Sequence, residues 1–329
     1  VDEIVQDQIA ASHPAGALVA EELARAAGVP TVSSRLVLLP DDPALGEFRE
    51  AFAGTLGTIS VYPQPVSETN PGFEGATEIL DHLELYAALR RSPGDRIDAE
   101  AFLRARLFDV FIGDWDRHRK QWRWAKMPGS ELWQPIPEDR DQAFSRYEGL
   151  LMAMVRPRQP RFVVFGPDYP KILGLTWNGW EQDRVLLTGL EWSVWERTAL
   201  DLQERLTDEV IDRAARKMPP EYFTLDGERQ AAALRKRRDS LPEAARDYYE
   251  LLAGEVDAHA TDQAEIAEIR WSKDGALELT VTPAGPDGEP AGEPLYRRLF
   301  LPKETNEVRV FLHGGDDRAV VKGPRGRIK

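Results

Sequence analysis

Two short acidic clusters, joined by a stretch with the pattern of a β-hairpin, constrain this chain more than any other feature. They are Phe111-Ile-Gly-Asp-Trp-Asp-Arg-His-Arg-Lys-Gln121 and Pro137-Glu-Asp-Arg-Asp-Gln-Ala-Phe144. Apolar residues at helical spacing precede the first cluster, so the predicted order is helix, acidic loop, hairpin, acidic loop. Sites of phosphoryl transfer are often assembled in this way, because one acid accepts a hydroxyl proton while another holds the metal that neutralises the phosphates.

The distribution of lysine indicates that part of such a site is missing. Lys120 is the first lysine in the chain, so no residue before it can supply the usual phosphate-binding lysine. The chain opens with Val1, and it ends at Lys329 within a pattern that reads as an unfinished strand. We therefore expect a fragment of a longer protein, with a processed mature form as the alternative.

Composition limits the classes of function. The 329 residues carry a net charge of −14, which argues against nucleic acid or an anionic membrane surface as the main partner. Cysteine is absent, which excludes disulfides, thiolate metal sites and a cysteine nucleophile. No apolar run reaches the ~18 residues of a membrane-spanning helix. The acidic charge and the β-rich end of the chain favour a secreted or bacterial cell-envelope setting.

The periodicity predicts an α+β fold in three regions. Residues 1–65 are expected to form a partial small lobe, with a helix and strands near 31–39 and 56–62. Residues 66–262 are expected to form a mainly helical large lobe, and residues 263–329 a β-rich domain, which a fragment would contain in truncated form. Within the large lobe the helices are predicted at 74–91, 98–112, 207–218, 227–239 and 241–253.

The first acidic loop contains a spacing that suits catalysis. Asp116 lies five residues before Gln121, which is the separation of the catalytic Asp and the metal-binding Asn in protein kinases. A tight loop of this length points the acid at the attacking hydroxyl and brings the later amide oxygen to the metal. A loop of solvated charges after a helix would have the same spacing, so the spacing alone decides nothing.

The second acidic loop offers carboxylates directly after a strand. Asp139 and Asp141 are two residues apart, and carboxylate oxygens are ligands that Mg²⁺ prefers. An Asp-rich turn with an internal hydrogen bond is the alternative. His118 has no partner at a metal-binding spacing, which favours an orienting or structural role. The basic run from Arg156 to Arg161 is either a solvated loop or a site for a phosphate or an acidic substrate.

The stretch Ile112-Gly-Asp-Trp-Asp-Arg-His118 resembles the Ile-Gly-x-x-Asp-Arg-His motif of atypical kinases. These include the secretory-pathway kinases and, more loosely, the bacterial spore-coat and phosphoinositide kinases. Asp139-Arg-Asp-Gln-Ala-Phe144 resembles their metal-binding loop, in which Phe follows Asp at the fifth position. The similarity covers residues 75–150.

The resemblance implies roles for individual residues. Asp116 would be the catalytic base, with His118 beside it in the catalytic loop. Asp139 would bind Mg (or Mn), with Asp141 close by and Gln121 as the second ligand where the families carry Asn or Glu. Glu3 would be the partner of the absent lysine. The first strands of the small lobe, with the glycine-rich loop that covers ATP, would then lie upstream of this chain.

Three functions stay open. The first is an atypical kinase-like phosphotransferase that moves the γ-phosphate of ATP to a hydroxyl on a protein, lipid or sugar. Without the upstream segment, this fragment would lack part of the site that activity requires. The second is a pseudokinase or binding module of a larger envelope protein, which the missing lysine favours. The third is a metal-dependent hydrolase, in which Asp114, Asp116, Asp139 and Asp141 would hold two metals ~4 Å apart.

Overall fold

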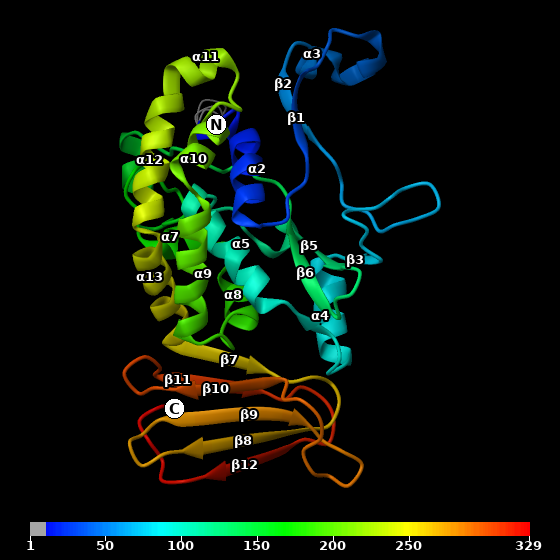
Figure 1. Cartoon of the computed structure of the whole chain (residues 1–329), viewed down its shortest axis with the longest axis vertical. Coiled ribbons are helices and arrows are strands. Elements are labelled where there is room, and N and C mark those ends of the chain that lie inside the picture. Colours follow the sequence, from blue (N-terminus) through cyan, green and yellow to red (C-terminus); the bar gives the residue numbers. More distant parts are fainter. Residues whose placement is uncertain (1–10) are drawn as a thin grey trace.

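The computed structural model describes residues 11–329, and it confirms a mixed α+β fold. Helices form one packed body, a two-stranded ribbon projects from that body, and the C-terminal strands lie against its opposite end (Figure 1). Glu3, expected to pair with a lysine, lies outside the described residues. Within residues 11–329 no helix is both long and apolar enough to cross a membrane.

The helical elements carry most of the chain before residue 254. They are α2 (Gly16–Ala27), the 3₁₀ turn Pro43–Phe48, α3 (Arg49–Phe52), α4 (His82–Arg91), α5 (Ala99–Ile112), the 3₁₀ turn Arg119–Gln121, α6 (Leu150–Val155), α7 (Ile172–Thr176), α8 (Trp180–Leu186), α9 (Trp192–Arg205), α10 (Asp208–Ala215), α11 (Pro220–Tyr222), the π-helical turn Phe223–Gly227, α12 (Glu228–Asp239) and α13 (Leu241–Ala253).

In the part of the chain that the structure describes, the strands form four small sheets. β1 (Ser34–Leu38) and β2 (Leu56–Ser60) make the projecting antiparallel ribbon. The second sheet has the order β3-β5-β6-β4, from Glu78–Leu80, Trp122–Lys126, Leu132–Pro137 and Arg96–Ile97. The third has the order β10-β9-β8-β12, from Tyr296–Phe300, Leu277–Pro283, Glu265–Trp271 and Arg318–Lys322. In the fourth, β11 (Glu307–Phe311) pairs parallel with β7 (Glu255–His259).

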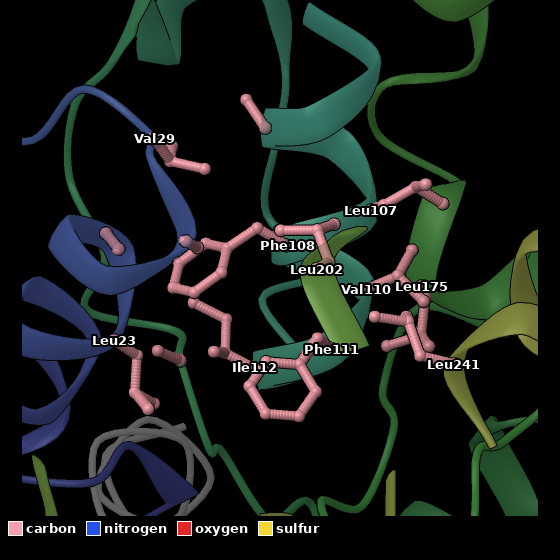
Figure 2. Packing of buried hydrophobic residues seen from close by; sticks show 14 of the residues in the cluster. Leu23, Val29, Leu107, Phe108, Val110, Phe111, Ile112, Leu175, Leu202 and Leu241 are labelled. Carbon is pink, nitrogen blue, oxygen red and sulfur yellow. The ribbon is translucent and has the colours of Figure 1, made fainter. Parts of the chain in front are cut away.

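Helix α5 is the centre of the helical body. Asp98 caps the helix by accepting a hydrogen bond from the Ala101 N–H. Helix α5 is buried on almost all of its sides. Figure 2 shows its side chains in the core, with Leu23 and Val29 to one side of Phe108 and Leu175 beside Val110. Because the acidic loop begins where α5 ends, the core fixes the position of that loop.

Two predicted boundaries differ from the structure. The helix predicted at 74–91 begins only at His82, because Asp81 and Glu84 form a capping box there and Ile79 pairs with Ala125 in a strand. The strands of the C-terminal part begin at Glu255, ahead of the predicted limit at residue 263, because β7 pairs with β11. The division of the chain into three domains stays a prediction.

Truncation of Leu107 to alanine tests whether α5 is the core. Leu107 is fully buried, so Leu107→Ala should lower the free energy of unfolding by about 3 kcal/mol through lost burial and a residual cavity. Leu200→Ala is the matched control, because Leu200 lies on α9 and is 49% exposed, and a change within about 0.5 kcal/mol is expected. Urea denaturation followed by circular dichroism measures both, and equal losses would contradict a core centred on α5.

Candidate functional site

The first acidic loop leaves α5 through a left-handed turn. Gly113 caps the helix with φ of 71°, and its N–H and that of Asp114 bond back to the carbonyls of Val110 and Asp109. A Cβ at residue 113 would also come within 2.9 Å of the Phe165 ring. Glycine is therefore required twice at this turn, by conformation and by space.

Asp116 is held by a side chain from a distant part of the sequence. Asn178, between α7 and α8, donates its Nδ2 hydrogen to Asp116 Oδ1 at 2.5 Å. The contact fixes the orientation of the carboxylate. No hydrogen bond to Asp116 Oδ2 is present within residues 11–329, so this oxygen can accept a proton from a substrate.

The expected metal ligands come together from two loops. The Gln121 amide Nε2 lies 3.4 Å from Asp139 Oδ2, and the Asp141 N–H lies 3.3 Å from Asp139 Oδ1. Asp139 has a φ of 49°, a conformation that is uncommon for an aspartate and recurs at functional sites. Burial, followed by the charge of Asp139, raises the pKa of Asp141 to about 6, and the charge of Asp116 adds to it. The carboxylates of Asp139 and Asp141 therefore interact electrostatically.

The ligand chemistry fits a hard divalent cation. Two carboxylates and an amide oxygen are oxygen donors of the kind that Mg²⁺ and Mn²⁺ take, once the Gln121 amide turns its oxygen inward. Within residues 11–329 no group of three or more His, Cys, Asp or Glu side chains is placed to hold a metal, so the expected site depends on Gln121 as well.

His118 and Asp114 point elsewhere. His118 lines a separate cavity of about 340 Å³ together with Tyr86 and Asn178. Asp114 is buried, with Oδ2 3.6 Å from Arg117 Nη1, and neither of its oxygens accepts a hydrogen bond within the described chain. Burial raises the pKa of Asp114 to about 7, although Arg117 lowers it. Asp114 therefore does not open onto the same site as Asp139.

Arg117 ties the two acidic loops together. Its Nη1 donates to the backbone carbonyls of Glu138 and Asp139 at 2.6 and 2.7 Å, and its Nη2 donates to that of Gln121 at 3.1 Å. Its Nε lies 3.3 Å from Asp109 Oδ2, and the whole side chain is buried. The sequence motif contained this arginine but gave no sign of its role.

Asp109 extends these contacts into the core. Its carboxylate also binds Arg106 at 3.1 Å and Arg140 at 2.8 Å, from α5 and from the second acidic loop. Arg106 in turn makes two bonds of 2.8 Å to Asp183. The hydrophobic periodicity of the sequence could not have predicted this network, because the partners of polar residues on a buried helix face are known only from the three-dimensional structure.

A cleft of about 360 Å³ lies between the second acidic loop, the start of α2 and the ribbon. Asp139 and Asp141 line one side, and the hydroxyls of Ser34, Thr58 and Ser60 line the ribbon side. No lysine lines this cleft within the described chain. The side chain of Arg140, its basic residue, is buried against Asp109 and Phe108.

Comparisons with known proteins give distant similarities. No protein-family model matches the sequence, and no curated protein matches it. The structure resembles a chain of the Shewanella oneidensis MR-1 toxin–antitoxin system HipA, HipB with its operator DNA, with TM-score 0.40, 12% identity and 71% of this chain covered. The match covers 57% of the HipA, HipB chain.

The structure also resembles the Helicobacter pylori proinflammatory kinase CtkA, with TM-score 0.37 and 14% identity. This match covers 71% of the present chain and 86% of the CtkA chain. Both overlaps are loose, so the function has to be argued from the residues of this chain.

The raised pKa of Asp114 gives a prediction about pH. The folded-state value lies above the ordinary 3.8, so ionisation of Asp114 costs stability as the pH rises toward 7. Asp114→Asn removes that cost. Between pH 3.8 and pH 7 the free energy of unfolding of this variant should rise relative to that of the wild type, by at most about 1.4 kcal/mol per pH unit.

Denaturation of both proteins at several pH values measures this difference. The exposed Asp287→Asn, whose position lies in the C-terminal part, is the control, and it should follow the wild type. A constant difference between Asp114→Asn and wild type across the window would show that Asp114 stays ionised in the folded protein.

Proposed function

We propose that this chain is a kinase-like phosphotransferase that transfers the γ-phosphate of ATP to a hydroxyl acceptor with the help of Mg²⁺. The observation that carries the proposal is the position of Arg117. One buried guanidinium binds carbonyls of both acidic loops and so keeps the loop of Asp116 beside the loop of Asp139. Phosphoryl transfer requires a base and a metal-binding acid at a fixed separation.

Each residue has a role in this proposal. Asp116 accepts the acceptor's hydroxyl proton at Oδ2, while Asn178 holds the other oxygen. Asp139, Asp141 and Gln121 hold Mg²⁺, which supplies neutralisation of the phosphate charge. The cleft beside Asp139 and the ribbon is the place for the nucleotide. Keeping the attacking oxygen in line with the phosphate is the main task of such a site.

A pseudokinase or binding module is the second candidate. The lining of the cleft favours this candidate. Within the described chain it holds no lysine, and its arginine, Arg140, is already paired with Asp109. A binding module of this kind would keep the fold and the loops but would turn over no ATP. The two-metal hydrolase has less support, because Asp114 is buried beside Arg117.

Thermal denaturation with Mg-ATP tests whether the cleft binds nucleotide. At a concentration about ten times the dissociation constant, a ligand stabilises the folded state by about 1.4 kcal/mol, and the melting temperature should rise by a few degrees. The rise should disappear with EDTA and in Asp139→Asn. The control Asp287→Asn carries the same change at an exposed position and should keep it. No rise in wild type would contradict the use of ATP.

Substitution of Asp116 separates catalysis from binding. Asp116→Asn should keep the Mg-ATP melting shift and lower the rate of γ-phosphate transfer about 10²–10⁴-fold, because only the proton acceptor is lost. Asn178→Ala should lower the rate by about tenfold, since the base is present but is no longer oriented. Release or transfer of ³²P from labelled ATP measures the rate. A wild type that binds Mg-ATP but shows no turnover would support the binding module.

A further inference from the structure

Another cavity, of about 690 Å³, lies in the segment that follows the second acidic loop. Arg156, Arg158 and Lys171 line it together with apolar walls that include Leu173 and Trp177. Trp177 and Leu173 expose 43% and 37% of their surface. The cavity therefore combines positive charge with an accessible apolar surface.

The charge of this cavity is opposite to that of the chain. The protein has a net charge of −14, yet no acidic residue lines the cavity within the described chain. Arg156 is fixed by the carbonyls of Tyr147 and Phe162, both at 2.8 Å. Arg158 and Lys171 are exposed and make no ion pair or side-chain hydrogen bond within residues 11–329. Two cations are thus available to a ligand.

The wall of the cavity is firmly packed. The Pro160 carbonyl lies so close to α7 that a Cβ at residue 174 would come within 2.4 Å of its oxygen, so only glycine fits there. Arg156 anchors the same loop from the other side through its carbonyl contacts. Arg158 and Lys171 are therefore presented by a preformed surface.

The cavity is connected to the proposed base through residues that are adjacent in the chain. Trp177 precedes Asn178, whose amide binds Asp116 at 2.5 Å. On the other side, the Arg161 guanidinium lies 5.9 Å from the ring centre of Trp115, the residue before Asp116. A segment that packs on Trp177 would therefore contact the residue beside the one that holds Asp116.

We propose that this cavity docks an acidic segment of a protein and brings its hydroxyl residue to Asp116. Carboxylates of the segment bind Arg158 and Lys171, and a large apolar side chain packs on Trp177 and Leu173. The inference rests on the proposed function, and it names the class of acceptor for that site. Charge complementarity favours an acidic polypeptide, and the apolar wall gives such a segment a second anchor.

Fluorescence anisotropy with a labelled peptide tests the docking on the full chain. The probe contains one serine, several glutamates and a leucine, and the comparison peptide has lysine at each glutamate. The acidic peptide should bind and the basic one should not. Arg158→Gln with Lys171→Gln should weaken binding of the acidic peptide about tenfold, and high salt should do the same. Lys303→Gln with Arg325→Gln removes the same charge at exposed positions of the C-terminal part and should leave binding unchanged.

The outcomes separate this inference from the proposed function. If the acidic peptide does not bind, or if both double variants lose binding equally, the docking site is overturned, whether or not Mg-ATP raises the melting temperature. If binding depends on Arg158 and Lys171 but Mg-ATP gives no shift, the docking stands and the use of ATP fails. The last experiment measures binding of the protein to vesicles of phosphatidylglycerol and phosphatidylcholine. Binding to them through the same two residues, without binding of the peptide, would overturn a protein acceptor.

Discussion

The buried contact between Arg117 and Asp109 is the interaction on which the rest of the site depends. Asp109 belongs to the central helix α5, and Arg117 belongs to the loop that follows it. Through that one carboxylate the core of the protein fixes an arginine, and through the arginine it fixes the backbone of both acidic loops. Breaking a buried pair by removing one partner costs about 3–5 kcal/mol, so position and stability are linked here.

Burying these charges is costly, and their mutual pairing offsets only part of that cost. Asp109 forms ion pairs with three arginines, Arg106, Arg117 and Arg140. Arg106 also donates two hydrogen bonds to Asp183. An apolar cluster of the same volume would often be as stable or more stable. The network instead aligns three separate segments, α5, the second acidic loop and α8, in one arrangement. Orientation of the loops, rather than stability alone, is what such a network adds.

The local structure around the site could be predicted because its signals are local. Asp98 caps α5 and glycine ends it, and both residues stand in the sequence where a helix boundary requires them. The hairpin between the acidic loops shows alternation and a Pro-Gly turn, and it forms as β5 and β6. Strand β3 was missed because its three residues also continue the apolar spacing of α4, and only the pairing with β5 decides between them.

The partners across the site could not be predicted, because they depend on distant segments. Asn178 lies 62 residues from Asp116, and Asp183 lies 77 residues from Arg106. The ribbon side of the cleft beside Asp139 shows a related limit. Within residues 11–329 the ribbon has two strands, and Ile59 on β2 and Val61 just after β2 are 63% and 62% exposed. A two-stranded sheet is marginally stable by itself. The cleft therefore combines one side that the core fixes with a ribbon side that few contacts hold.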